Sequence, residues 1–387
     1  MRLFGLFFLY AVSGMAQSSG VGFVPALTTG KLPMLAYGQG QDRLGGAKSG
    51  YIDTGVTIRV IDSTEAMYLV RLSAAHTAYI NKENVQPHNN YKAAPFYLTN
   101  SWSVKGDEKF DYLTINLDER LPYRSWMEIN PSKIVVELYG VQSNTNWITQ
   151  LRSAKEIASV DINQWEDDVV RATITLTHNQ HWGYSLQYNN KNLVIRVRRQ
   201  PTDLRVKSMK VAIDAGHGGS NTGAAGIKSK TFEKDYTVRF AEELRQVLQS
   251  KKVQVLLTRT GDTNIVNADR VIRLQEEMPD FLVSLHLNSS ASPAVKGVST
   301  YYKHIGFKPL TSAILNRMLE LNLNEFGHVG NFNFAMVAPT DFPSALVEVA
   351  FISNEEDEKR ILDPRFQRMV AKKIYRGIKD WLREVRE

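Results

Sequence analysis

Four separated segments of the sequence carry side chains that could hold a metal ion and activate water. His217 has glycine on both sides in the run Asp-Ala-Gly-His-Gly-Gly, and His286 closes a later apolar run. Glu233 and Glu348 add two carboxylates. Two histidines and one carboxylate are a recurrent ligand set for catalytic zinc, and a further carboxylate that does not bind the metal can move protons. The residue types therefore indicate a metal site with an acid–base group beside it.

The elements around these residues predict that all four meet at one edge of a sheet. One apolar strand leads into the loop of His217, a second ends at His286, and a third contains Glu348. Helical periodicity begins near Glu233. In open α/β sheets, functional groups gather outside the carboxyl ends of the strands. A lone histidine at a strand end is usually structural, but a glutamate inside the run Leu-Val-Glu-Val-Ala-Phe is costly unless it is paired or functional.

The four motifs, in this order, resemble the zinc-dependent N-acetylmuramoyl-L-alanine amidases of bacterial cell walls, the amidase type 3 family. The resemblance runs from about residue 209 to the C-terminus. It includes Leu-Thr-Arg at 257–259 and Glu-Val-Ala-Phe-Ile-Ser-Asn at 348–354. Four separated motifs rarely recur together by chance, so this resemblance is specific.

The resemblance implies a role for each of the four residues. By position, His217, Glu233 and His286 match the family's zinc ligands, and Glu348 matches its catalytic glutamate. The implied cofactor is Zn2+ and the implied partner is peptidoglycan. The implied reaction is hydrolysis of the amide bond between N-acetylmuramic acid and L-alanine of the stem peptide, in wall remodelling or daughter-cell separation.

Two polar residues close to the histidines are candidates for a supporting role. Asp214 and Asn288 are predicted to fix an imidazole tautomer, although either could instead cap a loop. Family members carry an arginine shortly before the second histidine strand. This sequence offers both Arg270 and Arg273, and it does not decide between them.

The segment 326–338, before Glu348, is rich in glycine, asparagine and aromatic residues. It could form a wall of the substrate site that brings His328 or Asn331 near the metal. A lid or a plain surface loop explains the same composition equally well. Between His286 and Glu348 we see no room for a large additional helix that would block the site.

The N-terminus predicts export. Arg2 precedes a short apolar run and small residues, so residues 1–16 are predicted to be a secretory signal peptide. The apolar run is shorter than the ~20 residues that span a bilayer, which predicts no stable membrane insertion, with a retained anchor as the minority alternative. We therefore expect an exported protein that is periplasmic or associated with the cell wall.

The composition excludes several classes of protein. The 387 residues are 43% hydrophobic and 22% charged, as in a folded chain with more than one core. A net charge of +7 would suit an acidic polymer such as the wall, or simply a basic surface. Basic runs interleaved with aromatic residues are absent from the sequence, which argues against nucleic acid. With no cysteine, any metal site must use nitrogen and oxygen ligands.

The sequence predicts a multidomain chain with two all-β modules ahead of an α/β domain. Short alternating strands over 32–87 resemble a bacterial SH3-type β-barrel. Residues 95–200 predict a β-sandwich similar to those found upstream of cell-wall amidases. Strands then alternate with helices over 209–387, which predicts a largely parallel sheet flanked by helices as the catalytic domain.

Two other functions remain open from the residues alone. One is a zinc hydrolase of a different amide, such as a carboxypeptidase or deacetylase. The other is a catalytically silent scaffold that binds the wall, against which the four intact positions argue. The sequence identifies neither the ligand of the β-modules nor an activator protein.

Overall fold

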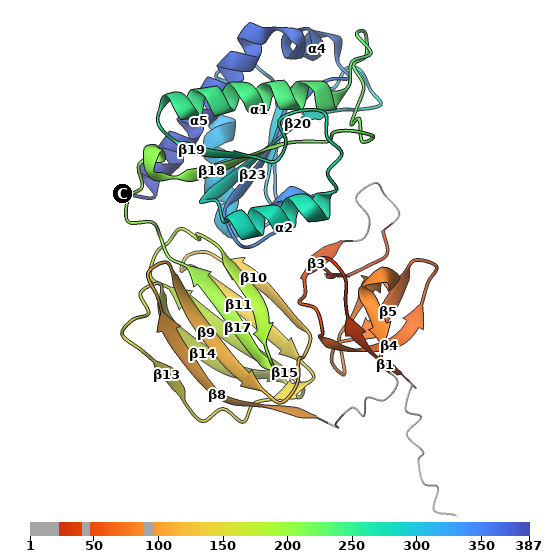
Figure 1. Ribbon diagram of the computed structural model, residues 1–387, viewed down its shortest axis with the longest axis vertical. Helices are drawn as coiled ribbons and strands as arrows, with labels where there is room; N and C mark the ends of the chain where they lie inside the picture. Colours follow the sequence, from red (N-terminus) through yellow and green to blue (C-terminus); the bar gives the residue numbers. More distant parts are fainter. Residues whose placement is uncertain (1–22, 41–46, 89–93, 95) are drawn as a thin grey trace, which may run out of the picture.

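The computed structural model describes residues 23–40, 47–88, 94 and 96–387, and Figure 1 shows the arrangement of its three parts. An N-terminal β-module and a β-sandwich lie side by side below a C-terminal α/β domain. The predicted signal peptide lies outside the described residues. Within the described ranges, none of the helices is both long and apolar enough to cross a membrane.

The N-terminal β-module is a single antiparallel sheet. Its spatial order is β3-β2-β6-β5-β4-β1-β7. Its core side chains, Ile58, Val70 and Ile80, are fully buried and belong to the same apolar cluster as the core of the sandwich. The SH3-like character of this module stays a prediction. The strands are β1 (Val24–Thr28), β2 (Met34–Ala36), β3 (Lys48–Tyr51), β4 (Thr57–Ser63), β5 (Met67–Arg71), β6 (Thr77–Asn81) and β7 (Val85–Pro87), with the short helix η1 (Lys82–Asn84) before β7.

The second part consists of two facing sheets. One has the order β10-β11-β15-β14, and the other has the order β12-β8-β9-β17-β16, with β13 also paired to β8. In β9 every second side chain is buried, as expected when one face of a strand lies on a core. The strands are β8 (Tyr97–Gly106), β9 (Phe110–Leu117), β10 (Tyr123–Glu128), β11 (Lys133–Tyr139), β12 (Val141–Gln142), β13 (Ile148–Gln150), β14 (Ile157–Glu166), β15 (Val169–Leu176), β16 (Tyr184–Asn189) and β17 (Asn192–Arg198).

The C-terminal domain is built on one sheet of order β19-β18-β20-β23-β21-β22. Its neighbours pair in parallel except β21 and β23, which are antiparallel. Nearly every side chain of β20 is buried, because both faces of the sheet are covered. The strands are β18 (Lys210–Ala215), β19 (Gln254–Leu257), β20 (Phe281–Asn288), β21 (Val298–Tyr301), β22 (Glu325–Val329) and β23 (Ser344–Phe351).

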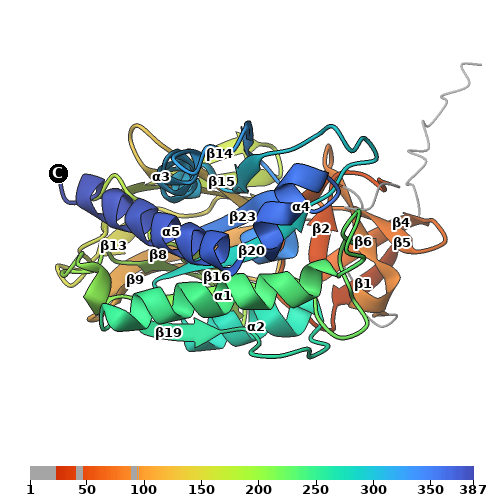
Figure 2. The ribbon, with the colours of Figure 1, turned by 90° about the horizontal axis from the view of Figure 1, so that it is seen from above.

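Helices cover the two faces of this sheet unequally. In Figure 2, α1, α5 and α3 lie together on the outer face, whereas α2 lies on the face turned toward the β-modules. The last helix begins at a proline whose predecessor, Asp363, accepts a hydrogen bond from the amide of Arg365. The helices are α1 (Glu233–Ser250), α2 (Asn267–Glu277), α3 (Lys308–Leu319), α4 (Glu355–Leu362) and α5 (Pro364–Glu384), with the short helices η2 (Val206–Ser208), η3 (Ile305–Phe307) and η4 (Ala335–Val337).

The alternation of side chains along the strands places His286 and Glu348 on the face of the sheet that α2 covers. Val283 and Leu285 of β20 point into the core under α1 and α5, whereas Leu282 points toward α2. Because successive side chains of a strand alternate, His286 lies on the α2 face with Leu282. Glu348 is the register partner of His286 on the neighbouring parallel strand, so it shares that face.

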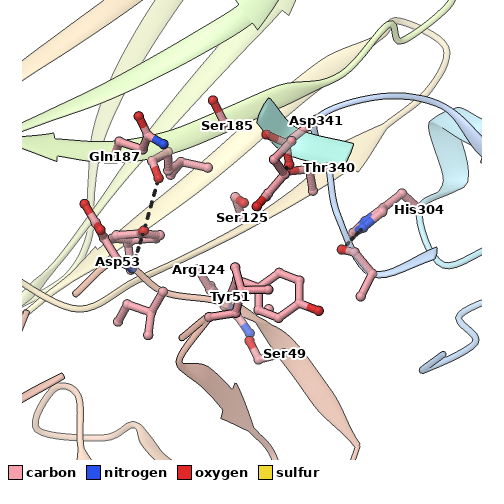
Figure 3. A pocket seen from close by; sticks show the side chains of 17 residues that line it. Ser49, Tyr51, Asp53, Arg124, Ser125, Ser185, Gln187, His304, Thr340 and Asp341 are labelled. Carbon is pink, nitrogen blue, oxygen red and sulfur yellow. Dashed lines mark hydrogen bonds between the residues drawn. The ribbon is translucent and has the colours of Figure 1, made fainter. Parts of the chain in front are cut away.

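The three parts pack against one another through specific contacts. Trp381 of α5 lies 5.3 Å from Trp182 of the sandwich, centroid to centroid, and its indole donates a 2.9 Å hydrogen bond to Gln180. A cavity of about 150 Å³ lies where all three parts meet (Figure 3). Tyr51 and Asp341 line it from the N-terminal module and from the C-terminal domain. The sandwich thus contacts α5 of the outer face, whereas Tyr51 of the N-terminal module packs against the apolar cluster on the α2 face, which carries the candidate site.

Candidate metal centre

Three side chains from distant segments converge at the carboxyl edge of the sheet. One oxygen of Glu233, Oε1, lies 3.1 Å from Nε2 of His217 and 3.0 Å from Nδ1 of His286. The two imidazole rings meet edge to face, with centroids 4.9 Å apart. One ligand atom from each of the three residues lies within 4.8 Å of the others. The structure thus brings together the three residues predicted to bind zinc.

Glu233 is the first residue of α1, and backbone amides fix the position of its carboxylate. The backbone amide of Leu287 donates to Oε1 at 2.9 Å, and that of Ala224 donates to Oε2 at 3.0 Å. The positive end of the helix dipole also favours a negative charge here. Burial raises the pKa of Glu233, but hydrogen bonds and charge interactions with the two histidines outweigh it, so the net pKa lies well below the usual range. The carboxyl group is therefore ionised, as a metal ligand must be.

His217 occupies a strained position in the loop after β18. Its φ of 63° lies in the left-handed region, which non-glycine residues rarely adopt. Nδ1 lies 2.9 Å from Oδ1 of Asn221, which orients the ring with Nε2 toward Glu233. Burial lowers the pKa of His217, but the hydrogen bond and the charge of Glu233 reverse the shift and leave the pKa above its ordinary value.

Glycines let the backbone come close to these ligands. A Cβ on Gly216 would stand 2.3 Å from Cε1 of His286, closer than atoms can approach. A Cβ on Gly223 would stand 2.5 Å from Oε2 of Glu233, and its φ of +66° also favours glycine. These two positions must be glycine because the ligands occupy the space of a side chain.

A buried ion pair between Asp214 and Arg270 stabilises the loop that carries His217. Nη1 of Arg270 donates to Oδ1 of Asp214 at 2.8 Å and to the carbonyl of Ala215 at 2.7 Å, and Nη2 donates to the carbonyl of His217. Burial raises the pKa of Asp214, but the charge of Arg270 leads the interactions that lower it below its usual value. Arg259, in the Leu-Thr-Arg segment, donates to the carbonyls of Ala215 and Gly216.

The supporting residues differ in detail from those expected. Asp214 accepts hydrogen bonds from Arg270, Thr258 and Ser284 rather than from an imidazole, so it acts on His217 through Arg270. The side-chain amide of Asn288 donates to the hydroxyl of Tyr301 at 3.3 Å. The amide that contacts a histidine belongs to Asn221, which the sequence analysis missed. Its position four residues after His217, in the same glycine-rich loop, was the available signal.

The sequence did not decide whether Arg270 or Arg273 lies at the site, and the structure places Arg270 there. Arg270 is buried at the site, whereas Arg273 donates to the carbonyl of Thr258 at 3.1 Å. The two arginines lie on the same side of α2, nearly one turn apart along its axis. Arg270 is nearer the start of the helix, and it donates to the carbonyl of His217.

Glu348 and the segment before it border the same site. Glu348 is half-buried beside His286. Phe334 packs edge to face on the His286 ring at 5.3 Å and, with Asn333, lines a cavity of about 210 Å³ that also contains both histidines. His328 instead lies 2.7 Å from the hydroxyl of Thr311. Of the segment 326–338, the residues that line this cavity are Asn333, Phe334, Ala335 and Met336, and neither His328 nor Asn331 lines it.

The donor set fits a zinc ion. Two imidazole nitrogens and one carboxylate oxygen are the ligands of many catalytic zinc sites, which keep a further position for water. Ligand atoms ~2.0–2.2 Å from a tetrahedral ion are themselves ~3.3–3.6 Å apart. The oxygen of Glu233 lies slightly closer than that to each histidine, at 3.1 Å and 3.0 Å, and all three ligand atoms lie within 4.8 Å of one another, so small shifts would bring them around one ion.

Comparison with known proteins bears on the chemistry of this site. Residues 211–380 match the N-acetylmuramoyl-L-alanine amidase family, Amidase_3, and residues 101–197 match the AMIN domain. The N-acetylmuramoyl-L-alanine amidase AmiC of Escherichia coli O6:H1 is 26% identical over 356 residues, covering 69% of this chain and 85% of that protein. The probable cell wall amidase LytH of Staphylococcus saprophyticus is 26% identical over 289 residues, covering 74% and 90%. The catalytic domain of the amidase CwlV from Paenibacillus polymyxa is 34% identical, covering 45% and 98%, with a TM-score of 0.41.

The C-terminal part of the chain is therefore an amidase domain of the Amidase_3 type. The chain is an N-acetylmuramoyl-L-alanine amidase, an enzyme class that acts on peptidoglycan. An AMIN domain precedes the catalytic domain and falls within the predicted sandwich.

Replacing Gly216 with alanine tests the close approach to His286. We expect Gly216→Ala to displace the imidazole, to weaken metal binding at least about tenfold, and to reduce activity in proportion. Metal titration and kinetic assays of the folded variant measure both effects. Gly261→Ala is the matched control, because a Cβ there meets no atom of the described structure within 4 Å. Wild-type metal affinity in Gly216→Ala would contradict this geometry.

Replacing Arg270 with glutamine tests how much the Asp214–Arg270 ion pair stabilises the protein. The substitution leaves the buried Asp214 carboxylate without its cation, which should lower the free energy of unfolding by about 3–5 kcal/mol. Chemical denaturation followed by circular dichroism measures the change. Arg273→Gln, three residues along the same helix, should change stability by less than about 1 kcal/mol. Equal effects of the two substitutions would remove the special role of Arg270.

Proposed function

We propose that this chain is an exported zinc enzyme that hydrolyses the amide bond between N-acetylmuramic acid and L-alanine of the stem peptide. The observation that carries the proposal is the convergence of His217, Glu233 and His286, with Glu348 in register beside them. We assign the metal-binding role to the first three residues and the catalytic role to Glu348. The amidase family match supports the class of bond.

The proposed chemistry divides between the metal and the protein. A zinc ion bound at this site supplies Lewis acidity, which polarises a carbonyl and makes water more acidic. Glu348 takes the proton of the attacking water and returns it to the departing amine of L-alanine. Asp214 and Arg270 position the loop of His217, and Phe334 shields the His286 ring from solvent.

The proposed location and role rest on the sequence and on the relatives. The N-terminal sequence pattern supports export, and two relatives carry the names of a peptidoglycan amidase and a probable cell wall amidase. We propose that the chain acts in the periplasm or at the wall, in wall remodelling or daughter-cell separation. We propose domain limits of 95–200 and 209–387 for the second and third parts. The first part was predicted to span 32–87, but it also includes β1 (Val24–Thr28), which pairs with β4 and β7, and we propose a barrel of SH3 type for it.

Replacing Glu348 with glutamine separates catalysis from metal binding. We expect Glu348→Gln to lower kcat at least about a thousandfold while leaving one zinc per chain, because glutamine cannot accept the proton of water. Mass spectrometry of digested sacculi measures activity, and elemental analysis measures zinc. The matched control is Glu325→Gln, at an exposed position of β22.

Three outcomes of this experiment would contradict the proposal. Retained hydrolysis in Glu348→Gln would remove the catalytic assignment. Release of shortened peptides or acetate in place of intact stem peptides would indicate a carboxypeptidase or deacetylase. Wild-type protein that binds zinc and leaves sacculi intact would favour the scaffold.

A further inference from the structure

The N-terminal module contacts the part of the amidase domain that borders the candidate metal centre. Residues 333–336 lie between β22 and β23, outside the sheet. They line the cavity of about 210 Å³ that contains His217 and His286, which we call the metal pocket. In Figure 1, β3 lies at the end of the module that is turned toward the C-terminal domain. One polar and one apolar set of contacts join the module to this segment.

The polar contacts involve Asn333, Lys48 of β3 and Lys303. Nζ of Lys48 donates to the carbonyl of Asn333 at 2.9 Å. Nζ of Lys303 donates to Oδ1 of Asn333 at 3.0 Å and to the carbonyl of Lys48 at 2.9 Å. Burial, followed by the charge of Lys48, lowers the pKa of Lys303 to about 8. Because the Lys303 ammonium group is largely removed from water, water does not readily replace a hydrogen bond that it loses.

The apolar contacts involve Leu32, in the turn before β2, and Tyr51 of β3. Both side chains pack against the cluster on the α2 face of the sheet, to which Met336 belongs and against which Ala335 also packs. Figure 3 shows Tyr51 at the cavity where the three parts of the chain meet. The module is therefore bonded to the residue before Phe334 and packs against the cluster that contains the residues after it.

The backbone of the module is strained at this contact. The φ of Leu32 is 47°, in the left-handed region, where a bulky side chain is an outlier. Such strain persists only where the surrounding structure compensates for it, and it is concentrated at functional positions. Because Leu32 packs against the cluster of the amidase domain, the docked arrangement supplies compensating contacts.

Phe334 lies between the two sets of contacts, and its ring touches a candidate metal ligand. The ring packs edge to face on His286, with centroids 5.3 Å apart and planes at 90°. It also stacks on Phe332 at 5.1 Å. Edge-to-face pairs have a preferred geometry, so Phe334 favours one orientation of the imidazole. Groups that orient a metal-binding histidine influence the metal site, so a shift of segment 333–336 would reach the metal pocket.

We propose that the N-terminal module is a positioning element of the amidase site. Leu32, Tyr51 and the backbone of β3 fix segment 333–336, and this segment places Phe334 against His286. Leu32, Tyr51 and Lys303 are thus positioning residues, because they act through Phe334. This inference rests on the proposed function, and it adds that turnover at the full rate requires the docked module.

Hydrogen exchange of the full-length chain tests the positioning without substrate or metal. Tyr51→Ala removes a contact from the module side, and Lys303→Met removes one from the amidase side. We expect each substitution to speed amide exchange in peptides covering 333–336 at least about tenfold, and to leave exchange in β5 and β6 at the wild-type rate. Tyr51→Phe keeps the ring and should keep wild-type exchange. Lys31→Gln is the matched control, because it removes only the exposed bond to Asp269 at the same module interface.

Turnover of soluble N-acetylmuramoyl tetrapeptide connects the contact to catalysis. We expect kcat to fall about tenfold in Tyr51→Ala and in Lys303→Met at saturating zinc, with one zinc still bound per chain, because a misplaced ligand lowers the rate before it is lost. Tyr51→Phe and Lys31→Gln should stay within about twofold of the wild type. Elemental analysis of the same samples measures the zinc content.

The outcomes separate positioning from stability and from the proposed function. Wild-type exchange in segment 333–336 of either variant, or faster exchange with unchanged kcat, would overturn the proposal. If Tyr51→Ala speeds exchange throughout the module, its effect is on stability, and Lys303→Met in the amidase domain decides. An inactive wild-type chain whose segment 333–336 still responds locally supports the docking contact and counts against the proposed function alone.

Discussion

A buried carboxylate must find partners, and Glu233 finds them in two imidazoles and two backbone amides. This interaction joins the start of α1 to the end of β20 and to the loop after β18. It also explains the unusual local features around it. The left-handed backbone of His217, the glycine at 216 and the buried Asp214–Arg270 pair each bring a ligand to Glu233 or hold it there.

Much of the amidase domain could be predicted because its signals are local. The apolar runs of β18, β20 and β23 and the stripe of α5 are strong patterns in the sequence. The convergence of His217, Glu233 and His286 followed from strand order and from the resemblance to a family. The all-β character of the first two parts followed from alternating residues, since half-buried strands have period two.

Other features depend on contacts between distant residues and could not be predicted. α2 has a weak sequence signal because only Val271 and Leu274 form its buried apolar stripe, and its other buried residue is the charged Arg270. The strand β14 has a weak signal because most of its side chains are exposed at a sheet edge. Asn288 was paired with a histidine by proximity in sequence, whereas its amide reaches Tyr301 across the sheet. No local pattern could place Lys48 beside the metal pocket, because that contact depends on how the modules pack.

Anomalous diffraction from crystals of the full chain grown with zinc tests the central claim most directly. Data collected on both sides of the zinc absorption edge locate the ion independently of its ligands. We expect a peak ~2.0–2.2 Å from one atom each of His217, Glu233 and His286. An ordered crystal with the zinc peak elsewhere, or with these three side chains intact and no zinc between them, would contradict it.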